Sequence, residues 1–169
     1  MKRSILFLSL FFCVAVNAQN VNVDALRKEY FKLNTDSVAC ARIYRILLNT
    51  DVKDNLLNGY KGAVSMIKAK YLKSKEEKIK LFTAGKKVLE QSIKTDSVNA
   101  ELRFLRFTIQ TNCPKALGYY KQIDPDKEFI ISHFTALKNS ELKQQIAEYL
   151  LSSSCVTADE KKKIKSAGY

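Results

Sequence analysis

Short helix-boundary motifs recur along this chain and constrain its fold more than any other feature. The phrases Leu33-Asn-Thr-Asp36, Leu48-Asn-Thr-Asp51 and Ile93-Lys-Thr-Asp96 each place an aliphatic residue two positions before Thr-Asp. The aliphatic residue can end one apolar helix face, and the Thr or Asp side chain can cap the helix that follows. The intervals between the three motifs are unequal, which indicates helix punctuation and not a duplicated repeat.

The apolar residues between these motifs recur at three-to-four spacing, which is the period of an amphipathic helix. Proline and glycine are scarce, with two and five residues, whereas an all-β chain needs many turn residues. We therefore expect an all-α fold of about nine helices, stacked as antiparallel hairpins with tetratricopeptide-like packing. The expected helices cover residues 23–33, 35–48, 51–72, 74–94, 98–112 and 140–152, and three more begin near Pro114, Pro125 and Thr157.

Several polar residues are expected to cap these helices. Ser74 with Glu77, and Thr157 with Glu160, have the spacing of capping boxes, in which two side chains satisfy each other's backbone N–H groups. Asn22 and Asp124 are the expected caps of the helices that start beside them. Helix capping therefore explains polar residues that would otherwise be candidates for catalysis or ligand binding.

The segment 98–112 has apolar side chains around most of its helical circumference. A helix of that kind is usually central in the packing of a protein. Its remaining polar residues fall on one narrow strip, because their spacing projects them from the same face. The strip consists of Asn99, Arg103, Arg106 and Gln110.

This strip is the best candidate for a binding site. Two arginines one turn apart can hold a carboxylate or a phosphate between them, with Asn99 and Gln110 as neutral partners. We favour a structural alternative, because an inward-facing arginine on a packed helix normally finds an internal acid. Arg103 and Arg106 would then fasten neighbouring hairpins. The candidate acids are Glu101, Asp124 and Asp126.

The sequence gives little support for a catalytic site or a metal site. His133 is the only histidine, and nucleophilic triads and most zinc sites need an imidazole with further positioned groups. No glycine-rich phosphate loop, calcium loop or Cys-x-x-Cys pair occurs. We therefore predict no enzyme activity, no metal and no cofactor, and an enzyme that uses His133 with Asp126 is the least favoured alternative. Tyr119 and His133 remain candidate binding residues only.

The first eighteen residues have the composition of an export signal. Lys2 and Arg3 precede an apolar stretch over 5–16, and the small residues of a cleavage site follow. The stretch is too short to cross a bilayer, and no second one follows it. We expect cleavage after Ala18 and a single helical domain over 19–169, located in the periplasm or secreted.

The chain is strongly basic, with 29 Lys and Arg against 17 Asp and Glu and a net charge of +12. Loss of the leader would remove Lys2 and Arg3 and leave 27 basic residues, for a net charge of +10. Such a charge attracts anionic partners at long range. For an exported protein these are anionic envelope components and not nucleic acid. A lysine-rich solvated surface is the other explanation of the charge, and it is the one that we favour.

Three of the four cysteines remain once Cys13 leaves with the leader. An oxidising compartment allows at most one internal disulfide among Cys40, Cys113 and Cys155. Cys113 and Cys155 both lie at expected helix boundaries, so they form the candidate pair. The alternative is that all three are independent apolar fillers.

Residues 82–103 resemble the second helix of a tetratricopeptide repeat that runs into the next repeat. Gly85, Leu89 and Ser92 fall where that motif places small, bulky and small residues. Ser97 stands where proline is usual, and the resemblance covers less than one repeat. It implies tetratricopeptide-like packing between neighbouring hairpins.

A wider resemblance covers roughly residues 60–150 as short phrases in a fixed order. They include Tyr60-Lys-Gly-Ala63, Phe82-x-x-Gly85, Asn99-Ala-Glu-Leu-Arg103 and Leu117-Gly-Tyr119. They resemble a family of small, uncharacterised, signal-bearing proteins of Bacteroidetes-type Gram-negative bacteria. The resemblance implies a helical architecture and an exported compartment, but no reaction.

These observations predict a non-catalytic envelope protein that binds a protein or peptide on one face of its helical hairpins. Fold type, compartment and the lack of a catalytic constellation support that prediction, although fold alone does not determine function. The alternative is a protein that binds an anionic small molecule or lipid headgroup through Arg103 and Arg106.

Overall fold

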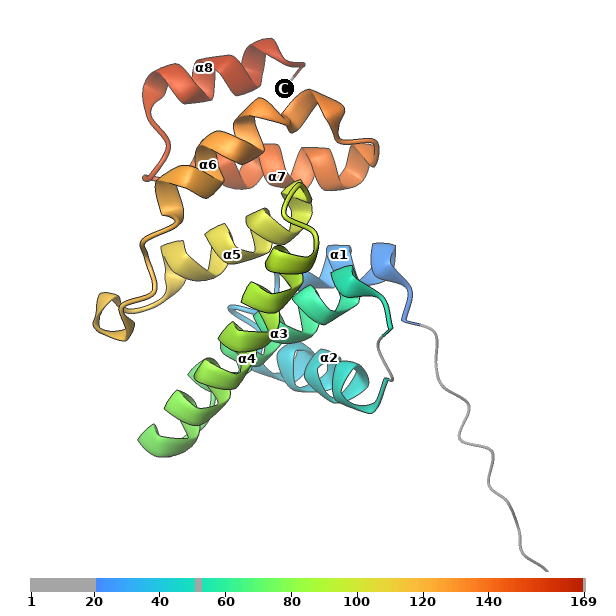
Figure 1. The fold of residues 1–169 in the computed structure, drawn as a ribbon, viewed down its shortest axis with the longest axis vertical. Helices are drawn as coiled ribbons and strands as arrows, with labels where there is room; N and C mark the ends of the chain where they lie inside the picture. The colour runs from blue at the N-terminus through green and yellow to red at the C-terminus, as the bar shows by residue number, and fades with distance from the viewer. Residues whose placement is uncertain (1–20, 51–52, 169) are drawn as a thin grey trace, which may run out of the picture.

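The computed structural model describes residues 21–50 and 53–168. Every regular element within these residues is helical and none is a strand, which confirms the predicted all-α fold (Figure 1). The predicted leader, its cleavage site and Asp51 lie outside the described residues. The eight α-helices are α1 (Val23–Tyr30), α2 (Ser37–Asn49), α3 (Asn55–Lys70), α4 (Lys75–Thr95), α5 (Ala100–Asn112), α6 (Ile123–Ser132), α7 (Ser140–Ser152) and α8 (Ala158–Ser166).

The helix expected after Pro114 is not an α-helix. Only Lys115–Leu117 turns there, as a single 3-10 turn, which is why the described residues hold eight α-helices and not nine. Gly118 ends the turn in the left-handed conformation, with φ of 62°, and its N–H donates to the Lys115 carbonyl. Tyr120, which follows this turn, is 49% exposed.

The start of α6 also differs from the prediction. The helix begins at Ile123, so Asp124 lies inside the first turn and does not cap it. Gln122 occupies the N-cap position without a side-chain hydrogen bond. Asp126 lies in the same first turn, where the helix dipole favours a carboxylate.

Two of the predicted boundary residues cap their helices. Asn22 caps α1 and Asp36 caps α2, each by accepting hydrogen bonds from backbone N–H groups of the first turn. The third junction differs, because Asp96 is the C-cap of α4 and Asn99 is the N-cap of α5. Asn99 Oδ1 accepts from the N–H groups of residues 101 and 102, at 3.1 and 3.2 Å.

One of the two predicted capping boxes is complete. Thr157 and Glu160 satisfy each other's backbone N–H groups at the start of α8. At the start of α4, Ser74 Oγ accepts from the Glu77 N–H at 3.3 Å, but its own hydroxyl donates to Glu76. The box at Ser74 is therefore half formed.

Gly62 on α3 and Gly85 on α4 allow the two helix backbones to touch. A Cβ on Gly62 would lie 2.7 Å from the Gly85 carbonyl oxygen, and a Cβ on Gly85 would lie 2.6 Å from the Gly62 carbonyl oxygen. Atoms do not approach so closely without displacement, so a side chain at either position would push the helices apart. The result is a tight antiparallel hairpin joined by the short link 71–74.

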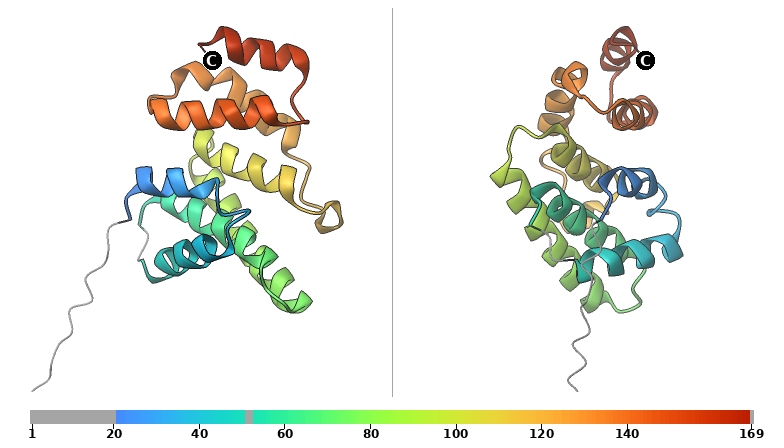
Figure 2. Two further views of the ribbon diagram at one scale, coloured as in Figure 1. Left: turned by 180° about the vertical axis from the view of Figure 1, so that it is seen from behind. Right: turned by 90° about the vertical axis from the view of Figure 1, so that its right-hand side faces the viewer.

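α5 lies between two hydrophobic clusters, as its apolar circumference predicted. Leu102, Leu105 and Ile109 pack with residues of α1–α4, whereas Phe104 and Phe107 pack with residues of α6–α8. In the views of Figures 1 and 2, α6–α8 lie on the side of α5 opposite α2–α4. The helix is therefore the shared wall of both clusters.

Candidate functional site

The predicted arginine strip faces carboxylates from neighbouring helices. Arg106 donates from Nε and Nη2 to the two oxygens of Asp126, at 2.7 Å each, and from Nη1 to Glu90 at 2.7 Å. Asp126 is completely buried and Arg106 is 6% exposed. A ligand could reach this guanidinium only by displacing a buried acid. The geometry is that of the structural alternative, with Asp126 as the internal carboxylate.

Tyr119 joins the same group of residues through Glu90. Its hydroxyl donates to Glu90 Oε1 at 2.6 Å, and burial, followed by this hydrogen bond, raises the pKa of Tyr119 well above its ordinary value. Burial opposes the charge of Arg106, but its bonds to Asp126 and Glu90 outweigh burial and raise the pKa of Arg106. We call Arg103, Arg106, Asp126, Glu90 and Tyr119 the Arg106 cluster.

Arg103 lies at the edge of this cluster and is held by three protein groups. Its Nη1 lies 3.3 Å from Asp126 Oδ1, and its Nε donates to the Ser97 carbonyl at 3.0 Å. Its Cζ lies 4.1 Å from the centroid of the Phe129 ring, a cation–π distance. Arg103 therefore serves the packing between α5 and α6.

His133 is exposed at the C-terminal end of α6. Its Nδ1 lies 2.9 Å from the Phe129 carbonyl oxygen and 3.0 Å from Ser132 Oγ, and its ring stacks on Phe129 at 3.9 Å. No hydrogen bond joins it to Asp126 or Tyr119 in the described part of the chain. The imidazole thus lacks the carboxylate partner that orients a general base.

The other two residues of the strip have separate surroundings. Asn99 caps α5 and donates from Nδ2 to Asp96 at 2.9 Å. Gln110 is 4% exposed, and its Oε1 has no hydrogen-bond partner within residues 21–50 and 53–168. The residues predicted as one binding strip therefore do not share one open surface.

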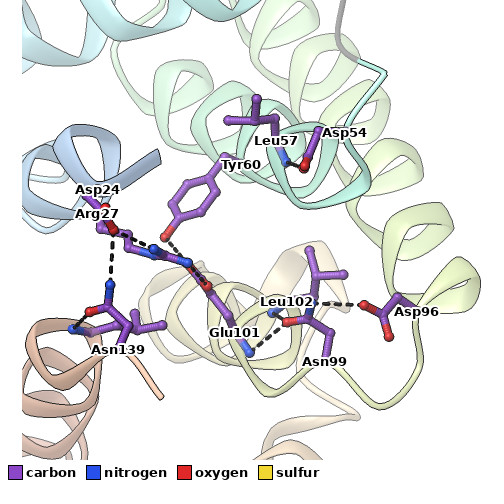
Figure 3. Close-up of polar contacts among 11 residues, drawn as sticks. Asp24, Arg27, Asp54, Leu57, Tyr60, Asp96, Asn99, Glu101, Leu102 and Asn139 are labelled. Atoms are coloured by element: carbon purple, nitrogen blue, oxygen red, sulfur yellow. Dashed lines mark hydrogen bonds and ion pairs between the residues drawn. The ribbon is translucent and has the colours of Figure 1, made fainter. Parts of the chain in front are cut away.

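A second ionic cluster, which the sequence did not reveal, surrounds Glu101 on α5 (Figure 3). Arg27 of α1 donates to both carboxylate oxygens, at 2.7 and 2.6 Å, and Tyr60 of α3 donates to Oε1 at 2.7 Å. Asp24 accepts from Arg27 at 2.6 Å and from Asn139, the cap of α7, at 3.0 Å. We call Glu101, Arg27, Tyr60 and Asp24 the Glu101 cluster.

Glu101 was one of the three candidate acids for the arginines of its own helix, and it pairs with Arg27 instead. Burial, followed by the charge of Glu101, raises the pKa of Tyr60. The hydrogen bond to Glu101 is the largest cause that raises the pKa of Arg27. The cluster joins α1, α3, α5 and α7, so its role is to fix these helices together.

Cys40, Cys113 and Cys155 are free thiols. Cys113 packs with the α1–α5 residues, with its Sγ 3.3 Å from the Tyr119 carbonyl oxygen, whereas Cys155 packs with the α5–α8 residues. The disulfide predicted between Cys113 and Cys155 is therefore not formed, because the two thiols belong to different clusters. Cys40 is completely buried, and burial raises its pKa to about 11.

An apolar groove of about 740 Å³ opens where the C-terminal ends of α3 and α5 meet the first turns of α4. Four aromatic side chains line it, namely Tyr30, Phe31, Phe82 and Tyr149. Leu117, in the turn after Pro114, lines another side, and this turn and the α3–α4 turn both lie at the left in Figure 1. The volume falls in the range of about 300–1,000 Å³ that is usual for ligand sites.

Three lysines, Lys70, Lys75 and Lys78, also line this groove, and none of the residues that line it is acidic. Lys70 donates to the backbone carbonyl and the side-chain oxygen of Asn34, at 2.7 and 3.2 Å. The side chains of Lys75 and Lys78 make no ion pair or hydrogen bond within the described residues. We call these three residues the lysine rim.

The sequence did not predict the apolar groove. Of the candidate residues named from sequence, only Cys113 lines it. The lining comes from α1, α3, α4, α5, α7 and the turn after Pro114, so no single helix carries its pattern. Ile79 and Leu117 have the spacing of packed helix faces in the sequence but are 48% and 38% exposed in the structure, so their spacing gave no signal of a groove.

Comparison with known proteins adds no relative to this description. No family model, no curated protein and no solved structure matches the chain. Within residues 21–50 and 53–168, no group of three or more His, Cys, Asp or Glu could hold a metal ion. No helix of the same residues has the length and apolar composition that a membrane crossing requires.

Proposed function

We propose that this protein is an exported, non-catalytic binding protein of the cell envelope, and that the apolar groove is its binding site. The observation that carries the proposal is a groove with four aromatic side chains in its walls, of which Phe31 and Tyr149 are partly exposed and Tyr30 and Phe82 are buried. Folding normally buries apolar surface, and contiguous exposed apolar patches are typical of interaction sites. The groove is also compact enough to surround most of a small occupant.

The surroundings of the catalytic candidates favour binding over catalysis. Both oxygens of Asp126 accept from arginines, so this carboxylate is committed to the packing. His133 bonds to a backbone carbonyl and a hydroxyl and has no carboxylate partner among the described residues. Neither residue lines the apolar groove.

A protein or peptide partner, as expected from the sequence, would place an apolar segment in the groove between hairpins of tetratricopeptide-like packing. An anionic small molecule or lipid is the second candidate, and a specific observation favours it. Lys75 and Lys78 line the groove without ion pairs in the described part of the chain, whereas Arg106 is neutralised by Asp126 and Glu90. The anion would therefore meet the lysine rim and not the arginine strip.

A neutral apolar dye tests the proposed site. N-phenyl-1-naphthylamine carries no charge at pH 7, and its fluorescence rises when it enters an apolar site. We expect saturable binding to the purified protein and about a tenfold loss in the Ile79→Asp/Leu117→Asp variant, because a charge in an apolar site costs free energy. Both replaced side chains are partly exposed, so the fold should tolerate the change.

The matched control is Val38→Asp/Val98→Asp, which replaces side chains 78% and 74% exposed that do not line the groove. This variant should bind the dye as the wild type does. Absence of saturable binding, or equal binding by both double variants, would overturn the proposed site.

Export is tested by the mass of the protein recovered from the cell envelope. The proposal expects a chain that starts at Gln19, since cleavage is predicted after Ala18. Recovery of the full-length chain from the cytoplasm would contradict it.

A further inference from the structure

The charges of the apolar groove are distributed unevenly. Lys70 ends α3, and Lys75 and Lys78 lie in the first turns of α4, so all three cations flank the α3–α4 turn. The lining from α1, α5, α7 and the turn after Pro114 is uncharged. A ligand that fits this distribution has one anionic end and an apolar body.

Two of the three cations at this end are available to a ligand. Lys75 and Lys78 have no ion pair within the described residues, in contrast to Arg27, Arg103 and Arg106. A carboxylate beside them would gain attraction without displacing an internal partner.

Acidic residues also lie at this turn. Glu76 and Glu77 are exposed next to Lys75 and do not line the groove. The three lysines of the lysine rim outnumber them and line the groove, so the charges at this turn favour an anionic end group.

The polar groups inside the groove are already satisfied. Asn112 Nδ2 donates to Tyr149 Oη at 2.6 Å and to the Thr108 carbonyl at 2.8 Å. Thr108 Oγ1 is hydrogen-bonded to Tyr30 Oη at 2.8 Å. An extended peptide would leave backbone N–H and C=O groups without partners there, whereas a hydrocarbon chain has none to satisfy.

Resting on the proposed binding function, we infer that the apolar groove binds a long-chain carboxylate, with the hydrocarbon chain along Phe82 and Ile109 and the carboxylate at the lysine rim. The chain supplies most of the affinity by leaving water. Lys75 and Lys78 supply the preference for an anionic end.

Displacement of N-phenyl-1-naphthylamine by dodecanoate and by 1-dodecanol tests this inference, because the two ligands share a chain length and differ in the charge of the end group. We expect dodecanoate to bind about tenfold more tightly than the alcohol at low salt, since each of the two exposed ion pairs contributes about a factor of three. Raising the salt to about 0.5 M should remove most of that preference.

Lys75→Ala/Lys78→Ala should lower dodecanoate affinity about tenfold and leave dodecanol affinity unchanged. The matched control is Lys80→Ala/Lys87→Ala, which removes two exposed lysines of the same helix that do not line the groove. This control should retain the preference for dodecanoate. Because both variants lose two charges, a difference between them reports position and not net charge.

The outcomes separate this inference from the proposed function. If the neutral dye binds the groove but dodecanoate shows no preference over dodecanol, the carboxylate inference fails and the binding site stands. Equal loss of dodecanoate affinity in both lysine variants also overturns the inference. If the dye itself does not bind, the proposed function fails first.

Discussion

The Arg106 cluster and the lysine rim both place cations beside α4, but they differ in burial and in what neutralises them. Arg106 is 6% exposed and bonds to two carboxylates, whereas Lys75 is exposed and has no ion pair within the described residues. A buried charge must be paired, so its pairing reports how helices are joined. An exposed charge beside an apolar groove is free to select a ligand.

Breaking the Arg106 cluster should have the largest effect on stability. In Asp126→Ala the Arg106 guanidinium stays buried and loses its bidentate partner, although Glu90 remains. We expect the free energy of unfolding to fall by about 3–5 kcal/mol, as for other buried pairs that lose one member. Urea unfolding followed by circular dichroism measures it.

Asp124→Ala is the control for this prediction. Its side chain lies in the same first turn of α6 but is 76% exposed, so its pair with Lys127 should contribute about 0.5 kcal/mol. A loss below about 1 kcal/mol in Asp126→Ala would contradict the structural role assigned to the arginine strip.

Breaking the Glu101 cluster should cost somewhat less. Glu101→Ala leaves the Tyr60 hydroxyl buried without its acceptor, but Arg27 keeps Asp24 and its side chain is 16% exposed. We expect a loss of about 2–3 kcal/mol in the free energy of unfolding, measured by urea unfolding. Glu141→Ala, at a half-exposed carboxylate paired with Lys28, should change it by less than about 1 kcal/mol. Similar losses in the two variants would show that the Glu101 cluster adds no specific stability.

A single hydrogen bond of the Arg106 cluster should have a smaller effect. Tyr119→Phe removes the donor to Glu90 but keeps the buried ring, so we expect a loss of about 1 kcal/mol. Tyr120→Phe, at the exposed neighbour, should leave thermal unfolding unchanged within error. A loss of about 3 kcal/mol or more in Tyr119→Phe would mean that Glu90 depends on this tyrosine for its position.

The fold followed from local sequence signals, whereas the site did not. Helix period and capping residues act within a few positions of each other, so Asn22, Asp36 and the Thr157–Glu160 box were predictable. The segment after Pro114 was wrongly predicted to be an α-helix, because Gly118, in the left-handed conformation, ends the helical structure after one turn. Proline marks where a helix can begin but does not ensure that it continues.

The sequence showed that certain buried charges need partners, but it did not show which residues those partners are. A helix with an apolar circumference that carries Glu101 and Arg106 must find partners for both charges. Asp126 was among the candidates for the arginines, but Arg27 lies 74 positions from Glu101 and shares no motif with it. The apolar groove was still harder to predict from the sequence, because the residues that line it come from six separate segments.

The smallest expected effect on stability is also the one that separates the two kinds of cation most sharply. Lys75→Ala/Lys78→Ala removes charges that hold nothing together within the described residues, so its free energy of unfolding should stay within about 0.5 kcal/mol of wild type. Urea unfolding at low salt is the relevant measurement, because salt would screen any weak surface interaction. A loss of 2 kcal/mol or more would place these lysines with Arg106 among the structural cations. Unchanged stability together with weakened dodecanoate binding would instead assign the arginines to the fold and the lysines to the ligand.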